Sequence, residues 1–388
     1  MTSQISIRKF AVSSSLIIAF AIGTSNVPVN AALPSNKCAK VGATKQVKRI
    51  VFVCAKSGKK LVWVKQSSNN SGQTPSASNS TPVTPTGWTD LEKYASAIPY
   101  ASWRESAAAI AAGVSKAPTP QYLNGTNVVI TNTSPATAIN LASRLFSNAP
   151  QPSQFTLLRY GHGDVQWAQS QWTGAFSGQD SNVPSEIQGT CSSASTCWGG
   201  VARMSNSGAG WIALASMQAN ANAKDSRHVT GAIEAHEYVH LIQYMPFLGV
   251  SGRSTSHLPR WLLEGMATYT QAAVLGATSY DAYVAERRRE TNGFRYGSAW
   301  LEAFLAPTGT DWTPWNSYTG NDSWRVYDVG FLATEVLVAL KGPGTAMQLF
   351  REVASGRTFN DAFAALYGIS WADAHKIIAR AIAIQVGS

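Results

Sequence analysis

The sequence predicts an α+β fold, and three features of its pattern lead to this class. Short β-rich stretches lie in the front half of the chain, whereas from about Val229 onward the apolar spacing is helical almost throughout. Residues 67–87, rich in Ser, Thr, Asn and Pro, cannot bury a core and predict a disordered linker. Residues 88–388 are then long enough for two lobes, a mixed sheet-and-helix lobe over about 88–225 and a mostly helical lobe over about 226–388.

The first 31 residues have the pattern of a secretory signal peptide. Arg8 and Lys9 form a charged start, Phe10 to Ile22 forms a short apolar core, and small residues precede a cut before Ala32. The apolar run is too short for a stable membrane span, and no second run of about twenty apolar residues follows it. The pattern predicts a protein that is secreted or associated with the cell surface, with no transmembrane segment after signal cleavage.

Residues 33–66 predict a small, basic, β-rich module. Val47–Val53 and Leu61–Lys65 are its β-rich stretches, and a Ser-Gly-Lys-Lys turn lies between them. So short a fold usually needs a covalent staple, which a bridge between Cys38 and Cys54 would supply. The module resembles the short lysine-rich segments near the N-termini of exported actinobacterial proteins.

The four cysteines form two pairs of near neighbours, Cys38 with Cys54 and Cys191 with Cys197. Export makes disulfide bonds the default state of such cysteines. Four cysteines allow three pairings, of which the two local ones are the obvious choice. Neither pair has zinc-finger spacing with histidines, which argues against a structural metal site.

The positive charge of the chain is concentrated at its front. The formal net charge is +10, and 11 lysine and arginine residues but no acidic residue precede Asp90. A basic exported segment indicates anionic polymers or lipids of the cell envelope as partners, and nucleic acid is not expected. The alternative is that this charge only keeps the segment in solution.

Apolar periodicity predicts the elements of the large region in order. The first lobe should contain strands at Val128–Thr131, Phe155–Tyr160 and Trp211–Ser216, and helices near Ala136–Asn148 and Gly163–Phe176. The helices expected after them are Val229–Tyr244, which Pro246 stops, Trp261–Ala273, Tyr280–Glu290, Trp324–Leu340, Ala346–Ala354, Phe359–Leu366 and Trp371–Ile384. The arginines at 287–289 are most simply a solvated helix face.

The segment His236-Glu237-Tyr238-Val239-His240 carries the strongest functional signal. Positions i and i+4 share one face of a helix, so the two imidazoles can reach a single metal ion. Glu237 stands beside the first histidine, where its carboxylate can accept a proton from a water held by the metal. The alternative is two unrelated histidines on an amphipathic helix.

A catalytic zinc site needs a third protein ligand, and the downstream sequence offers two candidates. A third histidine in the HExxHxxGxxH pattern is excluded because Gln243 and Pro246 occupy the relevant positions. Pro259 is typical of the first turn of a helix, and Glu264 interrupts the apolar residues that follow it. A carboxylate buried there would need a partner or a bound cation. His257, in the preceding loop, is the competing ligand.

The segment from Trp261 to Ala267, WLLEGMA, resembles the W-L-x-E-G-x-A motif of the gluzincin metallopeptidases, the clan of thermolysin and the alanyl aminopeptidases. The resemblance implies a zincin-like catalytic region in which His236, His240 and Glu264 bind one Zn²⁺ and Glu237 is the general base. It also implies that the strand at Trp211–Ser216 lies at the rim of the cleft and pairs with an extended substrate. An ordinary core strand is the alternative.

A tyrosine in a Y-x-x-G pattern donates to the oxyanion in the aminopeptidase branch of that clan. The stretch Tyr327-Asp328-Val329-Gly330 is similar to it, which makes Tyr327 the expected donor. A core tyrosine is the alternative for this residue. Tyr318 and Tyr296 are the other candidate donors.

The function expected from this resemblance is that of a secreted zinc metallopeptidase that hydrolyses peptide bonds of a protein or peptide substrate. The G-x-M-E-N signature of the aminopeptidases is missing, which favours an endopeptidase. Thr268 replaces the aspartate that thermolysin has one turn beyond its third ligand, and the sequence names no partner for either histidine. An inactive envelope-binding protein and a zinc amidase acting on cell-wall cross-links are the alternatives.

Overall fold

The computed structural model describes residue 38 and residues 44–47, 50–57, 60–65, 81–176, 183–291, 295–306 and 324–387. The chain divides into two units, residues 1–80 and residues 81–388, and each is described by itself. The predicted signal peptide and most of the predicted linker lie outside the described residues. Within the described residues, no helix has the length and apolar character needed to cross a membrane.

The front unit contains a three-stranded antiparallel sheet of β1 (Thr44–Val47), β2 (Ile50–Ser57) and β3 (Lys60–Lys65). The β-rich stretch predicted at residues 47–53 includes the last residue of β1 and the first four residues of β2, so it belongs to two strands. The predicted Cys38–Cys54 disulfide is confirmed, and both of its cysteines are buried.

The large unit contains a four-stranded sheet in the order β4-β5-β7-β6. Its strands are β4 (Gln121–Asn124), β5 (Gln154–Tyr160), β6 (Gly200–Met204) and β7 (Ala209–Ala215). β4, β5 and β7 run parallel, and β6 pairs antiparallel with β7. The predicted strand near residues 211–216 therefore forms, but it is interior, because β5 and β6 use both of its edges. The strand that ends the sheet on this side is β6.

The predicted strand at residues 128–131 is wrong, because this segment is irregular. Hydroxyl groups connect this segment to its neighbours in place of strand pairing. Ser216 Oγ donates to the carbonyl of Val129 (2.6 Å), and Thr131 Oγ1 donates to the carbonyl of His228 (2.8 Å). The β-branched residues of this segment favour an extended backbone, but an extended backbone can also occur in a connection outside a sheet.

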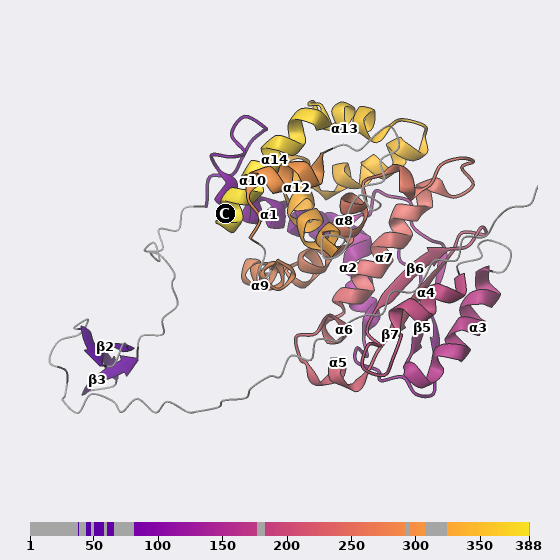
Figure 1. Cartoon of the computed structure of the whole chain (residues 1–388), viewed down its shortest axis with the longest axis horizontal. Coiled ribbons are helices and arrows are strands. Elements are labelled where there is room, and N and C mark those ends of the chain that lie inside the picture. The colour runs from indigo at the N-terminus through magenta and orange to yellow at the C-terminus, as the bar shows by residue number, and fades with distance from the viewer. Residues whose placement is uncertain are drawn as a thin grey trace, which may run out of the picture. The chain divides into compact units, whose positions relative to one another are not determined.

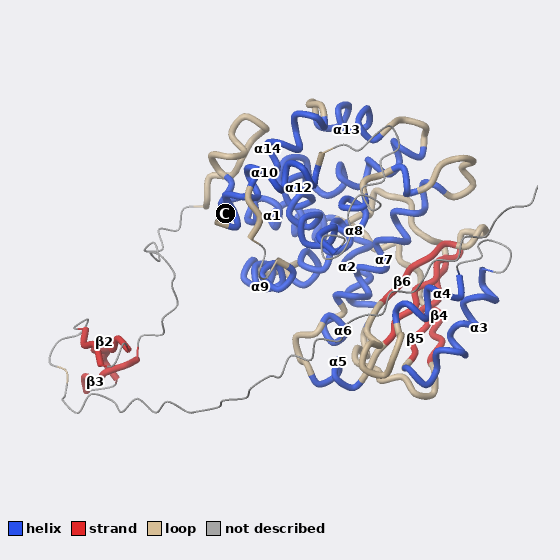
Figure 2. Tube along the Cα trace, viewed as in Figure 1, coloured by secondary structure: helices blue, strands red, loops and turns tan. Residues whose placement is uncertain are grey.

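Helices make up most of the large unit (Figures 1 and 2), which confirms the predicted α+β class. They are α1 (Ile98–Ala112), α2 (Pro135–Leu145), α3 (Val165–Phe176), α4 (Val183–Thr190), α5 (Gln218–Asn222), α6 (Arg227–Thr230), α7 (Ala232–Tyr244), α8 (Arg260–Leu275), α9 (Tyr280–Glu290), α10 (Ser298–Leu305), α12 (Arg325–Ala354), α13 (Phe359–Tyr367) and α14 (Trp371–Val386). The predicted helix that begins at residue 229 is two helices, because Gly231 has φ 84° between α6 and α7. Gly342, with φ 75°, interrupts α12 between the two helices expected there.

The sheet separates two hydrophobic cores, as the alternation of side chains along a strand requires. In β5, Leu157 belongs to the core shared with α2, α7 and α8, and its neighbour Leu158 belongs to the core shared with α3. Ile212 and Ala213 in β7 divide in the same way. Figure 2 shows α3 on one side of the red strands and α2 and α7 on the other. The fully buried Cys191–Cys197 disulfide belongs to the core on the α3 side, which confirms the second predicted pair.

The arginines at 287–289 do not form one solvated face. Arg287 is largely buried, and its Nε donates to Glu335 Oε1 (2.8 Å) while its Nη2 donates to Gln385 (2.7 Å). A buried charge of this kind persists only when it is paired and hydrogen-bonded, and the pairing comes from α12 and α14. Neighbouring sequence gives no sign of such distant partners.

Helices α8 and α12 approach each other backbone to backbone. A Cβ atom on Gly265 would lie 2.1 Å from the carbonyl carbon of Gly330, and a Cβ atom on Gly330 would lie 2.2 Å from the carbonyl oxygen of Trp261. Only glycine fits at both positions, because any side chain would separate the helices. The glycines of WLLEGMA and Y-x-x-G therefore have a shared steric role.

The first turn of α7 buries a carboxylate, Glu234, which is 3% exposed. Its Oε1 accepts from Asn132 Nδ2 (2.9 Å), whereas its Oε2 is buried without a hydrogen-bond partner. Burial raises the pKa of Glu234 to about 7, against the opposing effects of Asn132 and Arg159. The folded protein therefore binds this proton more tightly than the unfolded chain.

We expect Glu234 to make the folded protein less stable as the pH rises from about 4.5, where the unfolded carboxyl titrates, through about 7. Glu234→Gln should remove this loss, making the metal-free variant about 3 kcal/mol more stable than the wild type at pH 9 and nearly equal at pH 4.5. Urea unfolding at both pH values measures the difference. Glu105→Gln, at an exposed ion pair, is the control and should show no such dependence. A constant difference at all pH values would contradict the assignment.

Candidate metal centre

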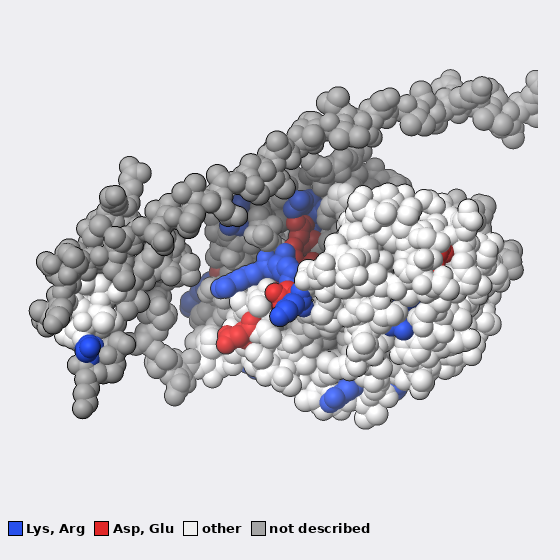
Figure 3. All heavy atoms as spheres, turned by 90° about the horizontal axis from the view of Figure 1, so that it is seen from below, with Lys and Arg blue, Asp and Glu red and all other residues white. Residues whose placement is uncertain are grey.

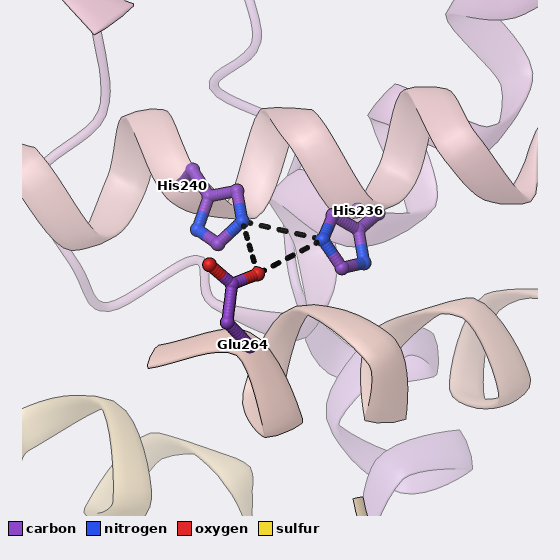
Figure 4. Close-up of side chains that lie close together, drawn as sticks. All are labelled: His236, His240 and Glu264. Atoms are coloured by element: carbon purple, nitrogen blue, oxygen red, sulfur yellow. Dashed lines mark hydrogen bonds and ion pairs between the residues drawn. The ribbon is translucent and has the colours of Figure 1, made fainter. Parts of the chain in front are cut away.

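Helix α7 presents His236 and His240 on one face, one turn apart. Both imidazoles are buried, at 6% and 5% exposure, and their Nε2 atoms lie 3.2 Å apart (Figure 4). Two nitrogen lone pairs this close repel each other unless a proton or a cation lies between them. The arrangement is the one predicted from the spacing of the two histidines.

Helix α8 brings Glu264 to the same point. Its Oε2 lies 3.5 Å from His236 Nε2 and 3.4 Å from His240 Nε2, so the three atoms form a nearly equilateral triangle. These residues form a buried group that could hold a metal ion, the only such group among the described residues. The predicted ligand set thus comes together, and His257 is not part of it. The ring of His257 instead caps a turn through Ser254.

The second oxygen of Glu264 points away from the histidines, toward Arg260. Arg260 Nη2 lies 2.5 Å from Glu264 Oε1, one turn earlier on α8. Burial alone would raise the pKa of Glu264, but His240, His236 and Arg260 together hold it well below its ordinary value. Glu264 is therefore ionised at neutral pH, with one oxygen bound by arginine and one facing the histidines.

A buried glutamine fixes the orientation of His240. Gln243 Nε2 donates to the carbonyl of Leu263 (3.0 Å), which leaves its Oε1 to accept from His240 Nδ1 at 2.7 Å. This bond places the proton of a neutral imidazole on Nδ1 and the lone pair on Nε2, toward Glu264. An outer partner of this kind orients a metal-ligating histidine and strengthens its donor nitrogen.

Gln271 occupies the same place behind His236. Its amide group lies 3.2 Å from His236 Nδ1, and its Oε1 is buried without a hydrogen-bond partner. The orientation of a side-chain amide is assigned from its hydrogen bonds, and turning this one by half a rotation lets the oxygen accept from Nδ1–H. Burial lowers the pKa of His236 to about 4, against the opposing effect of Glu264, so the ring is neutral as a ligand must be.

Glu237 lies against the cleft beside His236. The carboxylate is 6% exposed, and burial raises its pKa to about 7, with His240 and Arg227 opposing the rise. Gly200, at the start of β6, lies next to the Glu237 carboxylate. A Cβ atom there would lie 2.5 Å from Glu237 Oε1, so the absence of a side chain at Gly200 makes room for this carboxylate.

A cleft of about 550 Å³ opens onto this group. His236, Glu237 and Gln271 line it together with residues of α4, the loop before β6, α6 and the start of α12. A hollow of similar volume, about 570 Å³, lies between α1, α2 and α12, but none of the metal-group residues lines it. The cleft next to Glu237 is therefore the place where a substrate could meet the metal group.

Tyr327, at the start of α12, lines this cleft. Its ring stacks on that of His236 with 6.2 Å between centroids, and its hydroxyl hydrogen-bonds with Arg260. Burial and the charge of Glu264 raise the pKa of Tyr327, so the phenol keeps its proton and can donate. Tyr296 stacks on Trp300 instead and is absent from the residues that line the cleft, while Tyr318 lies outside the described residues.

Sequence reasoning missed the residues that surround the predicted ligands: Gln243, Gln271, Arg260, Gly200 and Arg227. Two of them carried a usable signal. Gln243 and Gln271 are polar residues in apolar helices, at spacings of three from His240 and seven from Glu264 that keep them on the ligand face. Comparisons with models of protein families, with curated proteins and with solved structures found no match to the chain.

We expect Gln243→Leu and Gln271→Leu each to weaken the affinity for zinc about 10- to 100-fold, because each leaves a ligand imidazole without its acceptor. Competition with a chromogenic chelator measures the dissociation constant, and circular dichroism checks the fold. Gln218→Leu, at an exposed position on α5, is the control. Unchanged affinity in both variants would show that neither glutamine supports a ligand.

Proposed function

We propose that this chain is a zinc-dependent peptidase of the gluzincin type, with His236, His240 and Glu264 as ligands. The observation that carries the proposal is the ligand triangle, with edges of 3.2, 3.4 and 3.5 Å. Tetrahedral zinc with bonds of 2.0 to 2.2 Å separates its ligand atoms by about 3.3 to 3.6 Å. Two histidines and one carboxylate are also a donor set of catalytic zinc, which keeps a fourth position for water.

The residues around the triangle fit this chemistry. When bound, zinc would polarise a peptide carbonyl and lower the pKa of a coordinated water from about 15.7 toward 7. Glu237, with its own pKa near 7, would accept the proton of the attacking water and return it to the leaving amine. Tyr327, held by Arg260, would donate to the oxygen on which negative charge develops.

The edge strand β6 is the proposed site for an extended substrate. It begins at Gly200, next to the Glu237 carboxylate, and among the described strands it pairs only with β7. A substrate strand could add to its free edge through backbone hydrogen bonds, which would place a peptide carbonyl near the metal group. In this proposal the sheet with its helices is the upper zincin lobe, and the helices from α8 onward form the lower one.

The Cys191–Cys197 bridge lies next to this strand and supports a role outside the cell, where disulfides persist. We therefore propose a secreted or surface-associated peptidase, and the basic front module would attach it to anionic envelope polymers. An amidase acting on wall cross-links would use the same ligands. A substrate screen that includes cross-linked wall fragments distinguishes that alternative from a peptidase.

Glu237→Gln is the central test of this function. The variant should bind one zinc per chain, as the wild type does, and lose nearly all ability to digest an unstructured protein, because the amide cannot accept the proton. Metal analysis and a digestion assay with and without a chelator measure both properties. A wild type without stoichiometric zinc would instead favour an inactive envelope-binding protein.

Gly200→Ala tests whether Glu237 needs the space that the absence of a side chain at Gly200 provides. Its methyl group would displace the flexible end of the Glu237 side chain rather than unfold the strand, because the nearest atom is Oε1. We expect kcat to fall by about 10- to 100-fold, the cost of misplacing a catalytic group by about 1 Å, while zinc content and Tm stay near wild type. Gly189→Ala is the control, since Gly189 lines the same cleft and has open space for a methyl group. Equal activity in the two variants would exclude the steric role.

A further inference from the structure

Two arginines line the cleft, and they differ in their partners. Arg325 forms an ion pair with Asp328, and its guanidinium also lies over the ring of Tyr296. Most arginines of the described residues likewise have a carboxylate within 4 Å, and in the face drawn in Figure 3 blue and red side chains lie next to one another. Arg227 has no carboxylate of the described residues within that distance.

Arg227 instead stacks on an aromatic ring at the edge of the cleft. Its guanidinium carbon lies 5.5 Å from the ring centroid of Trp198, whose side chain is 44% exposed. This is a cation–π contact with the ring face of Trp198, and no hydrogen bond or ion pair joins the guanidinium N–H groups to a described residue, so they are available as donors. A fork of such donors matches the two oxygens of a carboxylate.

Both members of this pair are held in position by buried neighbours. Next to Arg227, His228 is 3% exposed, and its Nε2 lies 3.1 Å from the carbonyl of Ala215 at the end of β7. Next to Trp198, Cys197 is fully buried in the disulfide with Cys191. The backbone at Arg227 and at Trp198 is therefore anchored next to the sheet.

Arg227 lines the same cleft as the proposed catalytic residues. His236 and Glu237 are among the other side chains that line it. Glu290 also lines the cleft and feels the charge of Arg227, but its oxygens stay beyond ion-pair distance. A cation is thus present beside the proposed reacting position, with donors that no acidic side chain of the described residues contacts.

We propose that Arg227, stacked on Trp198, binds a carboxylate of the substrate beside the bond to be cleaved. This inference rests on the proposed peptidase function and adds the substrate class. The carboxylate has two sources, an aspartate or glutamate side chain within the substrate or the free carboxyl end of the chain.

Three matched peptides separate these sources: one with an internal glutamate and an amidated end, one with glutamine in its place and a free carboxyl end, and one with glutamine and an amidated end. The wild type should cleave the peptide with the recognised carboxylate about 10- to 100-fold faster in kcat/KM than the uncharged peptide. Preference for the first peptide identifies a side chain, and preference for the second identifies the carboxyl end.

Arg227→Met keeps the apolar stem of the side chain and removes its charge, and it should abolish this preference, so that the three peptides are cleaved at similar rates. Arg227→Glu should favour a peptide with lysine at the recognised position. Arg351→Met, at an exposed arginine that lines the other hollow, is the control and should keep the wild-type preference.

Binding separates the failure of this inference from the failure of the proposed function. In the zinc-loaded Glu237→Gln background, calorimetry should show weaker binding of the preferred peptide when Arg227 becomes Met. A wild type that digests unstructured protein but cleaves the three peptides at equal rates overturns the role of Arg227 and leaves the peptidase intact. A wild type that binds zinc and cleaves nothing contradicts the peptidase itself.

Discussion

The close contact of α8 and α12 at Gly265 and Gly330 is the constraint on which the site depends. Glu264 precedes the first glycine by one residue, and Tyr327 precedes the second by three, so the crossing sets the distance between carboxylate and phenol. Arg260, on α8, then touches both. A methyl group at either glycine would meet backbone atoms of the other helix, which cannot move aside as a side chain can.

Charge balance explains why the surroundings of the metal group are built from amides. Glu264 of the group and Glu237 beside it are two carboxylates, whose charge when ionised would match that of one divalent cation. Gln243 and Gln271 orient the histidines without adding to this charge. A third and fourth carboxylate in their places would have to be buried next to the first two, at a cost that grows as water is excluded. Arg260 pairs with the oxygen of Glu264 that faces away from the histidines.

The sequence predicted the parts of the structure that depend on local spacing. His236 and His240 share a helix face because of helical geometry alone, and the buried carboxylate at Glu264 followed from its place in an apolar run. The sequence analysis did not identify the strand that ends the sheet, because β6 has only five residues, one of them an arginine, and lacks the apolar run that marks β7. Partners such as Glu335 for Arg287, or Trp198 for Arg227, come from distant segments whose approach only the fold decides.

The described site draws on short segments: one face of α7, about three turns of α8, the first turn of α12 and the start of β6. Few residue types are tolerated at the site positions of these segments. Each position needs a particular ligand atom, a side-chain amide or the absence of a Cβ atom at a defined place. Elsewhere the chain has only to fill the two cores, and many apolar combinations satisfy that demand. Motifs of a few residues can therefore resemble those of a known clan in a chain that matches no family model or solved structure over greater length.

Arg227 and Trp198 lie outside these segments, on α6 and the disulfide-bonded loop, where substitution leaves the metal group in place. If the proposed function holds, recognition of a substrate could change there while the metal group stays as it is.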